Sequence, residues 1–173
     1  MSEPTPAPTK LALVATLVAT GVAIGIFVGL RSDVVTPGFA AGFLWLFSSL
    51  FLVRVAGQLF VRLRQPAWLP PTDEWNLSPY RLLLPAQVGI LALMAWIDVS
   101  FSLDDGAPVH PHPDLGQGVL WFAYVYAGAM AVRYVIRMFR RPAERWFGGT
   151  IPIVFHFVLA AYLYVFGSFH ASH

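Results

Sequence analysis

The chain has 173 residues, of which 57% are hydrophobic and 12% charged, with a formal net charge of +2 and no cysteine. Soluble domains carry about 25% charged residues, and a soluble fold of this length cannot bury so much apolar surface. The composition therefore excludes an ordinary soluble protein and a basic nucleic-acid-binding surface. The lack of cysteine excludes disulfides, thiolate metal sites, iron–sulfur clusters and cysteine nucleophiles.

Five apolar segments fill most of the chain, and in order they cover residues 11–30, 38–61, 82–103, 117–139 and 147–169. Each approaches the roughly 20 apolar residues with which a helix crosses the ~30 Å hydrocarbon core of a bilayer. We therefore expect an all-α integral membrane protein, a bundle of about five transmembrane helices forming one domain over residues 11–169. The Pro-rich residues 1–10 are predicted to be a disordered tail, and residues 170–173 a C-terminal tail. The first segment exceeds the apolar core of a signal peptide, which favours a retained helix.

Arginine residues are concentrated in two of the connectors between these segments. They follow the second segment (Arg62, Arg64, Arg81) and the fourth (Arg137, Arg140, Arg141, Arg145), whereas the connector 104–116 has neither Lys nor Arg. Cytoplasmic loops of membrane proteins carry an excess of Lys and Arg. This pattern predicts a cytoplasmic N-terminus and an outside C-terminus, in a bacterial cytoplasmic (inner) membrane.

Several polar side chains fall inside the apolar segments, where ionisable groups are costly and usually functional. Arg54 and Gln58 are four residues apart and share one helix face, and the predicted orientation places the whole set in the inner-leaflet half of the bundle. The candidate ligand-binding residues are Arg54, Gln58, Gln87, Arg133, Arg137 and His156.

No acidic residue occurs in that half of the predicted bundle, because the nearest carboxylates, Asp73, Glu74 and Glu144, lie in the connectors. Unmatched guanidinium groups favour an anionic guest such as a lipid phosphate, a carboxylate or a cofactor propionate. Two alternatives stay open. The arginines reach headgroup phosphates while the glutamines tie helices together, or the arginines pair with carboxylates of the connectors.

His156 is the only histidine within a predicted span away from its ends. A neutral imidazole in a bundle core can ligate haem iron or a chlorophyll magnesium, or can hydrogen-bond a neighbouring carbonyl group. The second reading is favoured, because one histidine cannot supply both axial ligands of a bis-histidine haem.

A second polar group lies on the predicted outer side of the membrane. Imidazole and carboxylate suit Zn²⁺ or Cu²⁺, although a solvated loop and a loose tail explain the same residues more simply. Asp98, near the outer end of the third segment, is expected to support this site or to pair with Arg31. The candidate metal ligands are His110, His112, Asp114, His170 and His173.

No nucleophile elbow, phosphate-binding loop, dinucleotide fingerprint or zinc-protease motif occurs in the sequence. We therefore assign no catalytic residue and lean against an enzyme. Two hypotheses follow. The favoured one is an accessory or scaffold subunit of a larger respiratory or photosynthetic membrane complex, partnered by other membrane subunits. The alternative is a membrane protein or enzyme that binds an anionic lipid, a quinone or a tetrapyrrole, with or without an outer metal.

Overall fold

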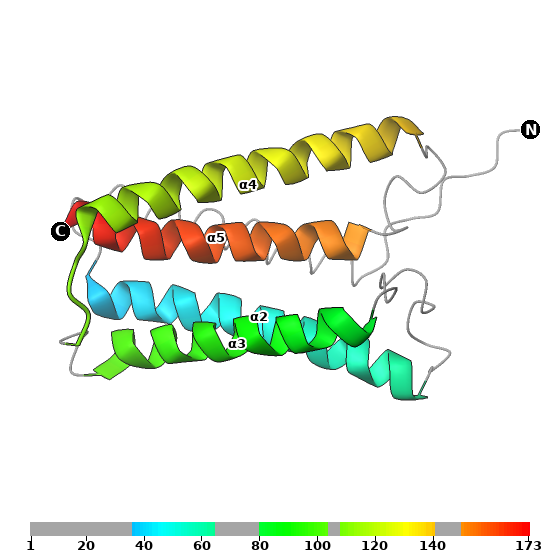
Figure 1. Cartoon of the computed structure of the whole chain (residues 1–173), viewed down its shortest axis with the longest axis horizontal. Helices are drawn as coiled ribbons and strands as arrows, with labels where there is room; N and C mark the ends of the chain where they lie inside the picture. Colours follow the sequence, from blue (N-terminus) through cyan, green and yellow to red (C-terminus); the bar gives the residue numbers. More distant parts are fainter. Residues whose placement is uncertain (1–35, 65–79, 104–107, 141–149) are drawn as a thin grey trace, which may run out of the picture. The chain divides into compact units, whose positions relative to one another are not determined.

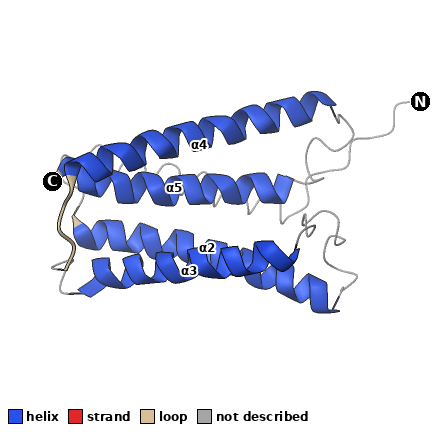
Figure 2. Cartoon of the chain, in the orientation of Figure 1, coloured by secondary structure: helices blue, strands red, loops and turns tan. Residues whose placement is uncertain are grey.

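The computed structural model describes residues 36–64, 80–103, 108–140 and 150–173, and all its regular structure in these residues is helical. The four helices are α2 (Pro37–Arg64), α3 (Tyr80–Ser102), α4 (Pro113–Arg140) and α5 (Thr150–Ser172) (Figures 1 and 2). Each is long and apolar enough to cross a membrane. The prediction of a multi-pass helical membrane protein is therefore confirmed at the level of length and composition. The predicted span 11–30, the tail 1–10 and Arg31 lie outside the described residues.

α2 begins one residue and α4 four residues before the predicted span, each at a proline, which suits the first turn of a helix. Thr36 caps α2, since its side-chain Oγ1 accepts a hydrogen bond from the Phe39 backbone N–H at 3.3 Å. At α4 the Gly116 N–H donates to the His112 carbonyl at 2.9 Å. Asp114 then lies in the first turn, where its charge is favourable.

The C-terminal residues form part of α5 instead of a separate tail. The helix continues through Ser172, three residues beyond the predicted end, because its last turns pack against the beginning of α4. His170 is only 4% exposed as a result.

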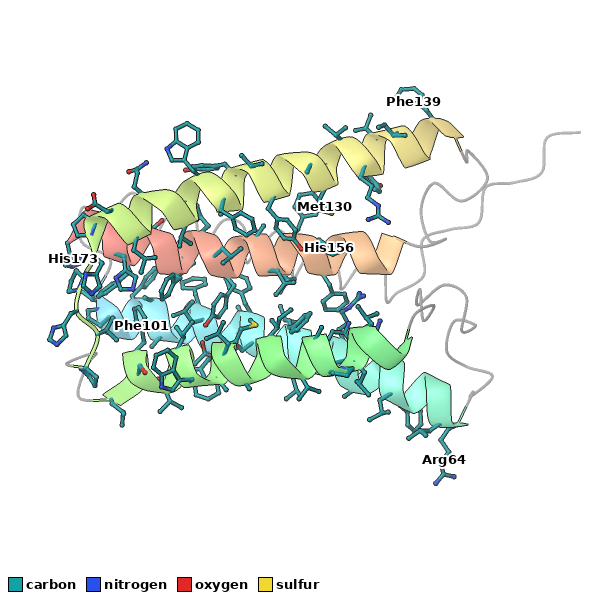
Figure 3. All side chains as sticks on the ribbon, viewed as in Figure 1. Arg64, Phe101, Met130, Phe139, His156 and His173 are labelled. Carbon is teal, nitrogen blue, oxygen red and sulfur yellow. The ribbon has the colours of Figure 1, made fainter. Side chains whose placement is uncertain are left out.

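The helices contact one another in a defined order, with α4 packed on α5, α5 on α2, and α2 on α3. The core between α2, α3 and α5 is mainly aliphatic and aromatic, and Leu44, Phe47 and Phe101 are at most 1% exposed in it. It also contains buried polar side chains, among them Gln58 and Asp98. By contrast, α4 leaves large apolar side chains exposed, with Trp121 at 64% and Phe139 at 81%. Phe139 is labelled near the end of α4 in Figure 3. Lipid covers such a surface when helices span a bilayer.

Two glycines allow α4 and α5 to approach closely. A Cβ atom on Gly116 would contact backbone atoms of His170 and Ala171, and one on Gly167 would lie 3.1 Å from the Gly116 carbonyl oxygen. Small residues at such crossings bring helix backbones together in membrane proteins.

The four described helices place their ends in two groups. The N-termini of α2 and α4 and the C-termini of α3 and α5 lie together near His173, at the left of Figures 1 and 3. We call this the histidine end. The opposite group, which includes Arg64 and Arg140, we call the arginine end.

Candidate functional site

Arg54 lies in the core of the helical bundle. Its side chain is 8% exposed, and its guanidinium carbon sits 5.1 Å from the centre of the Phe155 ring on α5. The guanidinium nitrogen Nη1 is buried and has no hydrogen-bond partner among the described residues. A contact with an aromatic face stabilises a cation, but it supplies no acceptor for this donor. Within the described part of the chain, Arg54 therefore retains a buried hydrogen-bond donor without an acceptor.

No described carboxylate compensates the charge of Arg54. Asp98 and Asp114 are the only acidic residues in the described part of the chain, and neither is among the groups that act electrostatically on Arg54. The connector acids Asp73 and Glu144 lie outside that part. A buried charge without a partner costs several kcal/mol unless something neutralises it.

Tyr126 of α4 and His156 of α5 form a polar pair beside Arg54. The Tyr126 hydroxyl and His156 Nδ1 are 2.5 Å apart, and the two rings meet edge to face with centroids separated by 5.7 Å. The charge of Arg54 acts on both side chains. The hydrogen bond occupies Nδ1, so Nε2 is the imidazole nitrogen outside this pair. His156 thus makes a hydrogen bond inside the bundle, although its partner is a tyrosine hydroxyl and not the carbonyl group expected from the sequence.

Arg133 contributes a second cation from α4. Its side chain is exposed, and its charge also acts on His156. We call the residues Arg54, Tyr126, Arg133, Phe155 and His156 the arginine cluster. Three helices supply it, and it includes three of the six predicted ligand-binding residues.

The two glutamines of the predicted set interact with each other. Gln87 Nε2 of α3 donates to Gln58 Oε1 of α2 at 3.0 Å, and both side chains are buried. This hydrogen bond links α2 to α3, as expected in the sequence-based alternative in which the glutamines connect helices. Arg137 is part of α4, and its side chain is not among those that the structure describes.

The predicted metal ligands meet only in part, at the histidine end. The His112 backbone N–H donates to His170 Nδ1 at 3.3 Å, and the two rings stack with centroids 6.4 Å apart. His173 Nδ1 is 3.0 Å from the Phe169 carbonyl oxygen. Within the described ranges, no three His, Asp or Glu side chains are grouped so that they could hold a metal ion. A Zn²⁺ or Cu²⁺ site therefore stays a prediction.

Sequence reasoning did not identify the partners of Asp98. This residue hydrogen-bonds Tyr162 of α5, and its expected partner Arg31 is outside the described residues. Tyr126 lies seven residues before Arg133 and therefore on the same helix face, which is a signal that the sequence offers. Nothing in the sequence linked Asp98 to Tyr162, or Arg54 to Phe155, because those pairs come from different helices.

Comparison with other proteins provides no assignment. No protein-family model, curated protein or solved structure is significantly similar to this chain. The functional argument therefore rests on the arrangement of its own side chains.

Proposed function

We propose that this protein binds one anionic group of an amphiphilic ligand, a phosphate or a carboxylate, at the arginine cluster. The observation that carries the proposal is the buried Nη1 of Arg54, for which the described residues supply no acceptor. An anion oxygen supplies that acceptor and neutralises the guanidinium at the same time. Hydrogen bonds between guanidinium and oxyanion are among the strongest in proteins and are often bidentate.

The other members of the cluster suit the same guest. Arg133 adds a second positive charge, and its exposed side chain is free to change rotamer towards a ligand. The Tyr126 hydroxyl and His156 are polar groups that can orient an oxyanion, while Phe155 offers an apolar face. An anion attached to an apolar body fits this mixture better than a free inorganic ion does.

Burial argues against the alternative in which Arg54 only reaches the headgroups. Ten residues separate Arg54 from Arg64 at the end of α2, a rise of about 15 Å. A side chain that is 8% exposed at that depth is packed inside the helices. Arg64 itself extends from the end of α2 (Figure 3). We place the arginine end on the cytoplasmic side, following the distribution of arginines.

Purification in a mild detergent, native mass spectrometry and extraction of bound lipids test this function. Arg54→Gln should lower the occupancy of a co-purifying anionic amphiphile by more than tenfold, since a hydrogen bond to a charged group contributes about 1.5–3 kcal/mol. Arg54→Lys should retain part of it, because Lys keeps the charge without the planar fork. Arg64→Gln, the exposed arginine of the same helix, is the matched control and should leave occupancy unchanged. A wild-type protein without any anionic ligand, or equal occupancy in Arg54→Gln, refutes the proposal.

The accessory-subunit hypothesis has a separate support in the exposed apolar side of α4, where Trp121 and Phe139 lie. A partner helix and lipid would both cover this side, so co-purification decides. A stoichiometric membrane partner favours a subunit, and a monodisperse single chain carrying lipid counts against one.

A further inference from the structure

Asp98 is buried within the bundle and only half of its carboxyl group is hydrogen-bonded. The side chain is 0% exposed, and the Tyr162 hydroxyl lies 3.0 Å from its Oδ1 atom. The second oxygen, Oδ2, is buried and has no hydrogen-bond partner among the described residues. Buried carboxyl oxygens are seldom left in this state, because the unmade interaction costs free energy.

Hydroxyl groups of two neighbouring helices, α2 and α5, act on this carboxyl group. Ser48 of α2 is 7% exposed, and its hydroxyl interacts with the Asp98 side chain, although Ser48 Oγ makes no hydrogen bond of good geometry. Tyr162 of α5 is 4% exposed, and its hydroxyl also lies 3.3 Å from the Met94 carbonyl oxygen. Asp98 Oδ2 and Ser48 Oγ are therefore two buried oxygens without a hydrogen bond of good geometry to any described residue.

No positive side chain in the described part of the chain balances an Asp98 carboxylate. The groups that act on it are the hydroxyls of Ser48 and Tyr162. On α2, Arg54 lies six residues beyond Ser48, about 9 Å along the helix axis. Its guanidinium group packs on the Phe155 ring and not on Asp98. On α5, His170 interacts with His112 and His173. Tyr162 is thus the titratable group that faces Asp98 from α5, and α2 presents none.

We infer that Asp98, Ser48 and Tyr162 form a binding site for one monovalent cation, either a proton or Na⁺. A proton on Oδ2 would donate to Ser48 Oγ and give both unpartnered oxygens a hydrogen bond. Na⁺ would instead be coordinated by the same oxygens, because carboxylate, hydroxyl and carbonyl oxygens are ligands of hard cations. A single carboxylate balances one positive charge, so a divalent ion would leave an excess charge in an apolar bundle.

The position of the site indicates from which end the cation arrives. Asp98 is four residues from the end of α3, about 6 Å along the helix, and therefore close to the histidine end. Phe101 and Phe169 follow in that direction, at 1% and 2% exposure, with ring centroids 4.8 Å apart. These aromatic rings separate the site from the helix ends, so exchange requires them to move.

Labelling of the purified full chain in lipid nanodiscs with a hydrophobic carbodiimide, which modifies protonated carboxyl groups, tests this inference. Peptide mass spectrometry should find Asp98 modified, with labelling that increases as the pH falls. Slower labelling in NaCl than in choline chloride of equal ionic strength identifies Na⁺ as an occupant. Equal labelling in the two salts identifies the proton alone. An Asp98 that stays unmodified over the whole pH range overturns the inference.

Thermal stability supplies a second readout that does not depend on the reagent. Wild-type stability should change with pH or Na⁺, whereas Asp98→Asn, which mimics the neutral carboxyl group, should lose that dependence. Ser48→Ala should weaken the dependence. Ser100→Ala should not, because the Ser100 hydroxyl bonds the Trp96 carbonyl oxygen of its own helix. Equal pH and Na⁺ dependence in wild type and Asp98→Asn refutes the site even if the variant is less stable.

Discussion

The crossing of α4 and α5 predicts a large effect from a very small substitution. A Cβ atom on Gly116 would lie 2.6 Å from the His170 carbonyl carbon and 2.9 Å from the Ala171 Cα atom, and closer still to the Ala171 nitrogen. All three are backbone atoms, so no side-chain rotation relieves the contact. Gly116→Ala must therefore push the two helices apart.

The size of the effect follows from these distances. Moving the His170 carbonyl carbon from 2.6 Å to an ordinary contact of 3.4 Å separates the helices by about 0.8 Å, and the closer Ala171 nitrogen requires a still larger separation. Overpacking of this kind costs about 1–3 kcal/mol, while alanine gains up to about 1 kcal/mol over glycine in helix propensity. At Gly118, two residues further along α4, a Cβ atom would meet nothing within 4 Å. Gly118→Ala should thus be neutral or stabilising, and the two variants should differ by about 2 kcal/mol.

Reversible unfolding of the purified protein in mixed detergent micelles measures this difference. Gly167→Ala should fall between the two variants, since its closest contacts are 3.1 Å. We expect the order of stability Gly118→Ala, then Gly167→Ala, then Gly116→Ala. A Gly116→Ala protein as stable as Gly118→Ala would show that α4 and α5 do not cross at this glycine.

Two further predictions concern the polar contacts. Gln87→Leu should lower the free energy of unfolding by about 1 kcal/mol, because it leaves the buried Gln58 Oε1 without this donor. Unfolding by urea or by a denaturing detergent measures this change. An unchanged unfolding midpoint would contradict the pairing of the two glutamines. Tyr126→Phe removes the hydroxyl that lies 2.5 Å from His156 Nδ1, so nitrogen NMR of ¹⁵N-labelled histidine should show a changed Nδ1 resonance for His156. Phe122→Leu, which alters only the ring stacked on Tyr126, is the control and should leave that resonance in place.

Much of the architecture could be read from the sequence, because it follows from local hydrophobicity. The length of each apolar segment predicted α2, α3, α4 and α5 to within a few residues, since a spanning helix must satisfy its own backbone in lipid. The boundaries differed where a cap or a packing contact decided them. α4 starts at Pro113, and α5 continues through Ser172. Both changes arise at the contact between the two helices.

The sequence also located Arg54, Arg133 and His156 as exceptional residues, because a charge or an imidazole in an apolar segment is recognisable without a fold. The sequence could not show which polar residues contact one another in the folded protein. Helix periodicity grouped Gln58 with Arg54 on one helix face, yet Gln58 pairs with Gln87 of α3.

Only the tertiary structure decided the partners across helices. Asp98 was visible as an acid near a helix end, but its burial and its contact with Tyr162 depend on how α3 packs against α5. Likewise the unused donor of Arg54 becomes apparent only once its neighbours are known. The physical reason is that hydrophobicity fixes the position of a residue along the membrane normal, whereas side-chain packing fixes the rotation of each helix and therefore which polar atoms meet.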